Sequence, residues 1–582
     1  MTPMKATPLS PIVILLFACT ATSAPTLQQS PATGERDRAA RLPELCSTYQ
    51  ADRGALGRLR NYAFSKPRLD AREALTREWL ARLDAIEFDL LPSRSDQIDW
   101  LLLDNQVRRD LARVAFDRSK EAQTAPLVPF IAPLMELLEA RALRKLPDPR
   151  AASEVLYQAR KDIETAREAN DANEELKVKG TIARRAASQL STVRAALAAW
   201  YRFGAGYDPL FSWWCKAPWE ELETALREYG EHLERDVGGL DPEDDDALVG
   251  DPIGREALLS ELSFERVPYT PEELIAIAER EFKWCDARRR EAAGELGFGD
   301  DFFAAQQHVR SLHVEPGGQP ELIRALADEA VTFLEERDLI TIPALAKESW
   351  RMGMMSPSRQ KYSPYFTGGE VISISYPTDG MDHDAKMQSM RGNNIHFSRA
   401  TVHHELIPGH HLQHFYASRW NHHRGGFSTP FYIEGWALYW EMRLWDMDFA
   451  RGPEDEIGML FWRSHRCARI LFSLNYHLGN WSPQECVEFL VARVGHERNN
   501  ATAEVRRSIQ GGYGPLYQAA YMLGGLQLVA LHKELVQDGD WNEREFHDAV
   551  LKQSSIPIEL VRAALGTTTL SREESAAWKF ND

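Results

Sequence analysis

Residues 402–413 read VHHELIPGHHLQ, and no other stretch of the 582-residue chain is as informative. A His-Glu pair that is followed within two helical turns by another His is the arrangement that zinc hydrolases use. In such sites two imidazoles hold the metal, and the carboxylate beside the first imidazole activates water. The usual spacing is H-E-x-x-H on one helix. Here Pro408 occupies the fourth position after His404, so the second imidazole must come from further along the chain.

Pro408 determines which His can be the second ligand. A proline removes a backbone donor and clashes with the carbonyl four residues back, so the helix must kink, bulge or end there. A bulge, helped by the backbone freedom of Gly409, would turn His410 toward His404. On a straight helix, His411 lies more nearly in line with His404. We expect His410 as the ligand and keep His411 as the alternative; a His-rich helix end that interacts with the helix dipole is the competing interpretation.

A third ligand is predicted in residues 431–441, which read FYIEGWALYWE. This run is apolar apart from its glycine and two glutamates, so its helix is expected to be buried. A buried carboxylate is costly unless it is paired or binds a metal. We therefore predict Glu434 as the third ligand, and Glu441, two turns further along the same face, as a group that orients a ligating His. The alternative is that Glu434 pairs with a buried arginine such as Arg391 or Arg507.

Several motifs resemble the bacterial DUF885 family. They are H-E-x-x-P-G-H-H-L-Q at 404–413, EGWALY at 434–439 and YQAAYMLG at 517–524, with IGREA at 253–257 and PEEL at 271–274 in the N-terminal half. The resemblance covers most of the chain, and the family is similar to the mostly helical gluzincin metallopeptidases. It implies a zinc ion as cofactor, with Glu405 as the general base and three ligands, His404, His410 and Glu434.

The same resemblance implies further site residues near the C-terminus. Helical gluzincins use a Tyr or His from a late segment to stabilise the oxyanion. Tyr521 is the first candidate for this catalytic role, and Tyr517 and His477 are further candidates for substrate contacts. Arg507 is a candidate for binding a substrate carboxylate, with a structural ion pair as its alternative.

Two stretches depart from the family pattern. Where the family carries RLVVDTGLH, residues 469–477 read RILFSLNYH, so Ser473 stands in place of an Asp. Where the family carries PGQA, residues 514–519 read GPLYQA. These changes affect the expected substrate contacts more than the metal ligands, and the proline in the metal motif is shared by the family.

The composition is that of a large globular protein with an acidic surface. Apolar residues make up 44% of the chain, with 16 Trp, 17 Tyr and 24 Phe, which is ample for a large core. The net charge of −18 argues against nonspecific nucleic-acid binding. The charge does not determine the substrate; the resemblance to metallopeptidases implies a peptide or another small amide as the partner of the site.

Residues 1–24 are expected to be an export signal. The apolar run at 12–18 is too short to span a bilayer. The LFAC sequence that ends at Cys19 resembles a lipobox, which would make Cys19 a lipid anchor and the only membrane contact; ordinary cleavage near Ala21 or Ala24 is the alternative. The protein is therefore expected in the periplasm or as a membrane-anchored lipoprotein.

The rest of the chain predicts a mainly α fold: a large helical body with a deep cleft and a small β element near the metal site. Residues 25–44 are expected to be a flexible tether, 45–345 a helical N-terminal lobe and 346–582 the metal-binding lobe. Helices at 399–418 and about 430–448 would carry the ligands.

Three local features complete these expectations. Thr270 and Glu273 form a capping box that starts a helix running to about Ala293. Residues 370–376, EVISISY, are a β-branched alternating strand that either pairs with an extended substrate or belongs to a structural hairpin. Cysteines 46, 215, 285, 467 and 486 either form one or two disulfides or, more in keeping with their apolar surroundings, are buried free thiols.

Together these observations predict a zinc-dependent hydrolase of peptide bonds. One alternative is an exported lipoprotein with a structural metal, in which His411 fills the open coordination position. Another is a zinc hydrolase of non-peptide amides. The sequence does not distinguish an exopeptidase from an endopeptidase.

Overall fold

The computed structural model describes residues 41–581 except 146, 173–177, 242–243, 245–246, 361–364, 568 and 574. The expected signal peptide, Cys19 and most of the expected tether lie outside the described residues. Helix α2 begins at Leu42, inside the range that was assigned to the tether. The described chain is mainly helical, as predicted, and within it no helix combines the length and apolarity that a membrane span requires.

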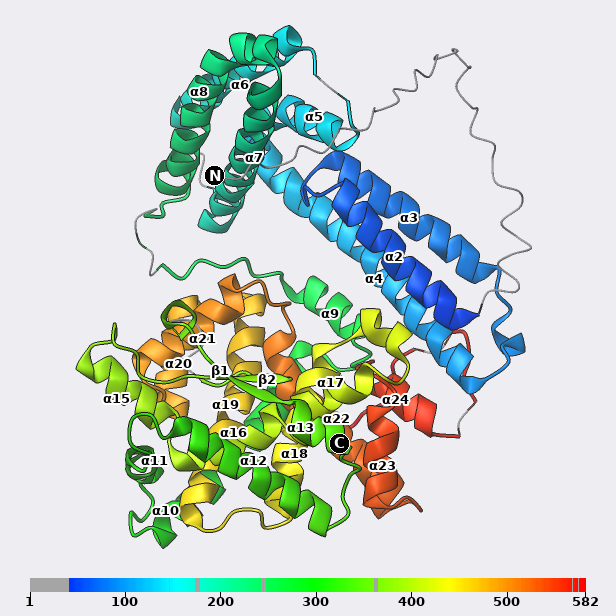
Figure 1. Ribbon diagram of the computed structural model, residues 1–582, viewed down its shortest axis with the longest axis vertical. Helices are drawn as coiled ribbons and strands as arrows, with labels where there is room; N and C mark the ends of the chain where they lie inside the picture. The colour runs from blue at the N-terminus through cyan, green and yellow to red at the C-terminus, as the bar shows by residue number, and fades with distance from the viewer. Residues whose placement is uncertain are drawn as a thin grey trace, which may run out of the picture. The chain divides into compact units, whose positions relative to one another are not determined.

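The first helices pack side by side (Figure 1). They are α2 (Leu42–Leu59), α3 (Lys66–Asp84) and α4 (Arg94–Thr124), with short 3₁₀ turns at Phe88–Leu90 and Ala125–Leu127. The next four helices form a bundle with its own core, whose buried side chains are almost all apolar, including Leu197 and Leu222. These helices are α5 (Ile131–Ala142), α6 (Pro149–Ala172), α7 (Gly180–Tyr207) and α8 (Pro209–His232), and a π-helical turn follows at Leu233–Val237.

The second half of the chain forms the helical body around the candidate site. Its leading helices are α9 (Arg255–Phe264), α10 (Pro271–Glu295), α11 (Phe302–Ser311), α12 (Gln319–Glu336), α13 (Ala344–Ser349), α14 (Pro357–Gln360) and α15 (His383–Gly392). They are followed by α16 (Ile395–Glu405), α17 (His410–Ala417), a 3₁₀ turn (His422–Phe427), α18 (Pro430–Asp446), α19 (Pro453–Leu478) and α20 (Pro483–Val494). The last are α21 (Arg498–Gln510), α22 (Tyr517–His532), a π-helical turn (Lys533–Gln537), α23 (Glu543–Leu551) and α24 (Ile558–Leu565).

Helices α18 and α22 make the closest helix contact in this body. A Cβ atom at Gly435 would lie 2.6 Å from the backbone of Gly524, and one at Gly524 would lie 1.9 Å from the carbonyl oxygen of Phe431. The two glycines therefore let the backbones touch. As the apolar run at 431–441 predicted, α18 is buried almost all round, and it brings Glu434 into the interior.

The predicted capping box at α10 is confirmed. The hydroxyl of Thr270 accepts from the Glu273 amide at 3.2 Å, and the Glu273 carboxylate accepts from the Thr270 amide at 2.6 Å. Pro271 occupies the first helical position, where its missing N–H costs nothing. The helix runs to Glu295, two residues beyond the predicted end, and packs along α19.

The β element is smaller than predicted and its topology differs. Strand β2 covers Val371–Ile374 and pairs in parallel with β1, Arg351–Met354, so the expected hairpin is limited to a single antiparallel bridge. The partner was missed because RMGM carries no alternating β-branched pattern. Thr367 forms an antiparallel bridge to Ser373, and the Gly369 amide donates to the Glu405 carbonyl at 3.2 Å. The β element therefore lies beside the metal motif, as expected.

The described cysteines settle the disulfide question. Cys46, Cys215, Cys285, Cys467 and Cys486 are all buried and free. The expected buried thiols are confirmed, and the disulfide alternative is wrong for these residues.

Candidate metal centre

The metal motif spans a helix break and not a bulge within one helix. Helix α16 ends at Glu405 and α17 begins at His410, so the single helix expected over 399–418 is two helices. A Cβ atom at Gly409 would lie 1.8 Å from the carbonyl oxygen of His404, so only glycine fits this turn. The indole of Trp436 on α18 donates to the Pro408 carbonyl at 2.8 Å and holds the turn against α18.

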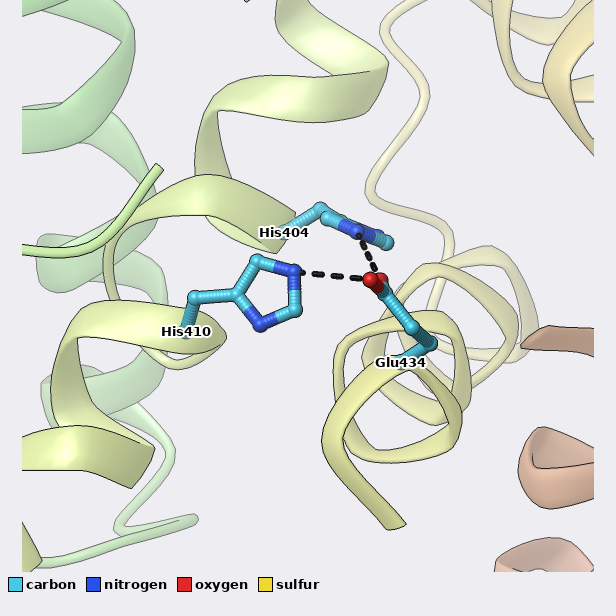
Figure 2. Close-up of side chains that lie close together, drawn as sticks. All are labelled: His404, His410 and Glu434. Atoms are coloured by element: carbon cyan, nitrogen blue, oxygen red, sulfur yellow. Dashed lines mark ion pairs between the residues drawn. The ribbon is translucent and has the colours of Figure 1, made fainter. Parts of the chain in front are cut away.

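The structure brings His404, His410 and Glu434 together (Figure 2). Their ligand atoms all lie within 4.8 Å of one another. The Glu434 Oε2 atom is 3.2 Å from His410 Nε2 and 3.7 Å from His404 Nε2. All three residues are buried. The alternative in which Glu434 pairs with a buried arginine is not what the structure shows, since its charged neighbours are these two imidazoles.

This donor set fits a tetrahedral zinc ion. Zinc–ligand bonds of about 2.0–2.1 Å place neighbouring ligand atoms about 3.3 Å apart. The two separations from Glu434 are close to this value, and the two imidazole nitrogens lie within 4.8 Å of each other. Glu434 Oε2 is buried without a hydrogen-bond donor among the described residues, which leaves a lone pair for a cation. Burial raises the pKa of Glu434, but the two imidazoles lower it by a larger amount, so the pKa lies well below its ordinary value.

His404 is oriented from behind by Glu441, as expected. Its Nδ1 atom lies 2.6 Å from Glu441 Oε1, which directs Nε2 toward Glu434. The Arg466 guanidinium lies 3.4 Å from the same Glu441 oxygen. Burial lowers the pKa of His404, but the Glu434 and Glu441 carboxylates raise it more, to about 9.

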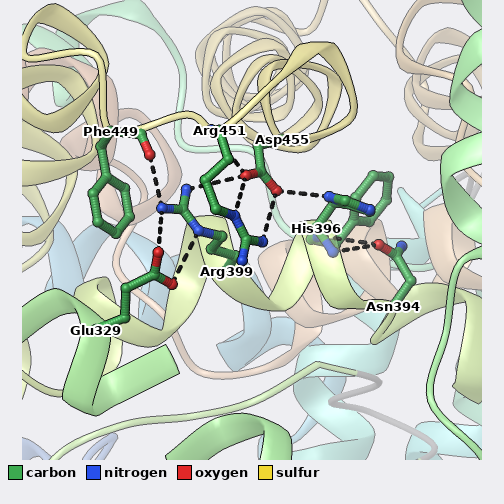
Figure 3. A network of polar contacts seen from close by, with 8 residues as sticks. Glu329, Asn394, His396, Arg399, Phe449, Arg451 and Asp455 are labelled. Atoms are coloured by element: carbon green, nitrogen blue, oxygen red, sulfur yellow. Dashed lines mark hydrogen bonds and ion pairs between the residues drawn. The ribbon is translucent and has the colours of Figure 1, made fainter. Parts of the chain in front are cut away.

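A buried polar network holds α16 in place (Figure 3). Arg399 forms ion pairs with Glu329 of α12 at 2.9 Å and with Asp455 of α19 at 3.4 Å. His396 Nδ1 lies 2.6 Å from the same Asp455 carboxylate, and the Asn394 side chain caps the first turn of α16. Burial raises the pKa of Asp455, but its contacts with His396 and Arg399 help to lower it by a larger amount, so the pKa lies well below its ordinary value. The helix that carries His404 is thus fixed to α12 and α19.

A cavity of about 340 Å³ opens onto the three ligands. Glu405 lines it, as expected for a general base. Among the other described residues of its wall are Thr367, Gly368, Arg466, Arg469, Arg507, Tyr513, Tyr517 and Tyr521. The site therefore consists of three ligands that lie close together in one wall of a cavity, and the cavity is large enough for a small molecule.

The two predicted tyrosines both reach the metal ligands. The Tyr517 hydroxyl donates to Glu434 Oε1, the oxygen that does not face the imidazoles. The Tyr521 ring stacks on His404 with 6.3 Å between ring centroids. Burial and the nearby Glu434 raise the pKa of Tyr521 to about 12, so its hydroxyl is a proton-bearing donor at neutral pH.

Two sequence candidates lie elsewhere. His411 Nε2 lies 2.8 Å from the carbonyl oxygen of Ala346, and His411 is not in the ligand trio. His477 is not among the described residues that line the cavity; it lies near Tyr476, in the last turn of α19. Helix α19 lines the cavity about two to three turns earlier, at Arg469 and Arg466.

Sequence reasoning missed these two arginines as cavity residues. Arg466 and Arg469 are 5% and 4% exposed in an apolar helix. The argument that identified Glu434, a charge inside an apolar helical run, applies equally to them.

Comparison with known proteins identifies the family and the fold. The profile of a bacterial family of unknown function, DUF885, matches residues 48–565. The chain belongs to the DUF885 family. No curated protein matches the sequence.

Two solved structures share the fold of this DUF885 protein. One is a candidate lipoprotein of unknown function from Shewanella oneidensis, with 16% identity, a TM-score of 0.67 and coverage of 90% of this chain and 99% of that chain. The other is a candidate lipoprotein from Colwellia psychrerythraea, with 14% identity, a TM-score of 0.55 and coverage of 90% and 98%. At these identities the likeness shows the fold alone.

Proposed function

We propose that this DUF885 protein is a zinc-dependent hydrolase of peptide bonds, similar in its site to the helical gluzincin metallopeptidases. The observation that carries the proposal is the trio of His404, His410 and Glu434 at the wall of a cavity that Glu405 also lines. A zinc ion held by this trio would supply a Lewis acid and would lower the pKa of a bound water to about 7.

The residues of the chain then divide the remaining work. Glu405 accepts the proton of the attacking water and returns it to the leaving nitrogen. Tyr521 donates from its hydroxyl to the developing oxyanion, a role for which its protonated state suits it. Tyr517 holds Glu434 by its free oxygen and so keeps the other oxygen directed at the imidazoles.

Two observations favour this function over a structural metal. His411, the residue that could close the coordination shell, is engaged with the Ala346 carbonyl. The described residues supply three ligands and not four, and three protein ligands with an open position are typical of catalytic zinc. A hydrolase of non-peptide amides would use the same chemistry and differs only in substrate.

We also propose that the protein is exported and anchored by a lipid at Cys19. The lipobox-like LFAC sequence motivates this proposal, and two proteins of the same fold are described as candidate lipoproteins. Radiolabelled palmitate incorporation that is lost in Cys19→Ser would support it, and a soluble, unlabelled wild-type protein would contradict it.

The function is tested by digestion of a peptide library with purified protein, with and without a chelator. We expect cleavage that the chelator abolishes and zinc restores. No cleavage by protein that contains one zinc ion would favour the structural-metal alternative. Products trimmed from one end would identify an exopeptidase.

A further inference from the structure

The cavity beside the metal site carries an excess of positive charge. Its described wall contains four arginines, Arg359, Arg466, Arg469 and Arg507, but only two carboxylates, Glu405 and Glu434. Both carboxylates already have a role in the proposed function, one as base and one as ligand. Because like charges in a confined cavity repel, the arginines favour an anionic occupant.

Three of these guanidinium groups are only partly paired. Arg469 donates from Nε to Glu504 at 2.7 Å, and Arg466 donates to Glu441 at 3.4 Å. Arg469 Nη1, Arg466 Nε and Arg507 Nε are buried with no acceptor among the described residues. These three atoms are shielded from the cavity, so an anion in it would bind through other atoms of the same arginine side chains, which line the wall.

Glu504 shows how strongly the arginines act on a carboxylate. Burial raises its pKa, but Arg469 and Arg507 lower it further, to about 2. Arg469 forms the ion pair with Glu504, whereas no carboxylate among the described residues pairs directly with Arg507. The planar fork of arginine matches a second carboxylate in a bidentate geometry.

The arginines reach the metal ligands through the two tyrosines. The Arg469 guanidinium lies 4.4 Å from the centre of the Tyr521 ring, which stacks on His404. The Arg507 guanidinium lies 4.9 Å from the centre of the Tyr513 ring. The centres of the Tyr513 and Tyr517 rings are 4.3 Å apart. One extended residue spans about 3.3–3.6 Å, so an anion held here belongs to a residue within a few positions of the scissile bond.

We propose that Arg466, Arg469 and Arg507 form a carboxylate-binding subsite, so that the substrates are short peptides anchored by a carboxylate within a few residues of the bond that is cleaved. This deepens the proposed hydrolase function and rests on it for the position of that bond. A cavity of about 340 Å³ holds only a short segment of peptide. The carboxylate is either the C-terminus of the peptide, which makes the enzyme a C-terminal exopeptidase, or an acidic side chain.

The subsite is tested by binding and not by turnover. Zinc-loaded Glu405→Gln protein is mixed with an equimolar pool of N-acetylated tripeptides, as free acids and as C-terminal amides, and bound peptides are identified by mass spectrometry. We expect the free acids to be enriched at least about 10-fold over their amides, which corresponds to about 1.4 kcal/mol. Enrichment of amides that contain Asp or Glu instead supports the subsite and identifies the anchor as a side chain.

Variants show whether the arginines cause the preference. Arg507→Gln, at a half-buried residue, is expected to reduce the enrichment at least about 5-fold. Arg469→Lys keeps the ion pair with Glu504 but loses the fork, and it is expected to reduce the enrichment as well. Arg498→Gln is the matched control on the same helix: its guanidinium pairs with Glu488 at the surface and leaves the preference unchanged.

The outcomes separate the two proposals. Equal capture of acids and neutral amides, capture of no peptide, or a preference that survives in folded Arg507→Gln and Arg469→Lys overturns the subsite. A carboxylate preference in a wild-type protein that hydrolyses no peptide keeps the subsite and rejects the hydrolase.

Discussion

The bundle of α5–α8 and the helices around the metal site are both densely packed, but they bury different side chains. Most buried side chains of the bundle are apolar, such as Leu190 and Leu197, and its few buried polar groups include Glu139, Gln189 and His232. The body around the site buries charged groups, among them Arg399, Asp455, Glu441 and Glu504. Burying a charge is costly unless it is paired, so such groups are concentrated where a particular geometry is required. The bundle provides stability, whereas the charged body positions the chemistry.

The largest predicted effect is on turnover. Glu405→Gln removes the proposed general base but no ligand, so kcat is expected to fall by about 10²–10⁴ while zinc content and thermal stability stay unchanged. Steady-state kinetics and metal analysis on the same preparation measure both. The control is Glu223→Gln in the bundle, whose carboxylate pairs with Arg194 at the surface and which is expected to leave kcat unchanged. Full activity in Glu405→Gln would reject the assigned base.

A pair of variants separates stability from site geometry. Arg399→Met breaks a buried ion-pair network and is expected to lower the free energy of unfolding by about 3–5 kcal/mol and to weaken zinc binding, because α16 carries His404. Leu197→Ala in the bundle core is expected to cost about 2–5 kcal/mol and to leave zinc affinity unchanged. Urea unfolding and chelator competition measure the two quantities. Equal effects of both variants on zinc affinity would remove the contrast between the two regions.

A smaller effect is predicted behind the ligand. Glu441→Gln retains an acceptor for His404 but loses the charge, and zinc affinity is expected to fall about 10–100-fold. Glu543→Gln is the matched control, since Glu543 also pairs with a histidine, His532 at 3.0 Å, outside the cavity wall. If both substitutions left the zinc Kd unchanged, Glu441 would have no role in orienting the ligand.

The smallest effect is a dependence on pH. The pKa of Glu504 is lowered from 4.5 to about 2 in the folded protein, so the folded state binds this proton less readily than the unfolded chain. The contribution of the ionised Glu504 carboxylate to the free energy of unfolding is complete above pH 4.5 and is lost as the pH falls toward 2. The slope from this group is at most about 1.4 kcal/mol per pH unit. The free energy of unfolding should therefore change less steeply with pH across this range in Glu504→Gln than in the wild-type protein. An unchanged slope would show that the carboxylate is not paired in solution.

Much of this arrangement could be predicted from the sequence because single residues carried strong physical signals. The carboxylates of Glu434 and Glu441 stood out in an apolar helix, and the Thr270 cap fixed the start of α10. The end of α16 could not be predicted, because whether Pro408 bulges or ends a helix depends on what packs against it, here Trp436. Strand β1 could not be predicted, because its residues do not show the alternating β-branched pattern that indicates a strand.

The central claim is that one zinc ion is bound by His404, His410 and Glu434 with a position left open. X-ray absorption spectroscopy at the zinc edge of the purified protein tests it most directly. We predict one zinc per chain, with two imidazole nitrogens at about 2.0–2.1 Å and the remaining ligands oxygen. A protein that binds no zinc, or a shell with sulfur or with three imidazoles, would contradict the account.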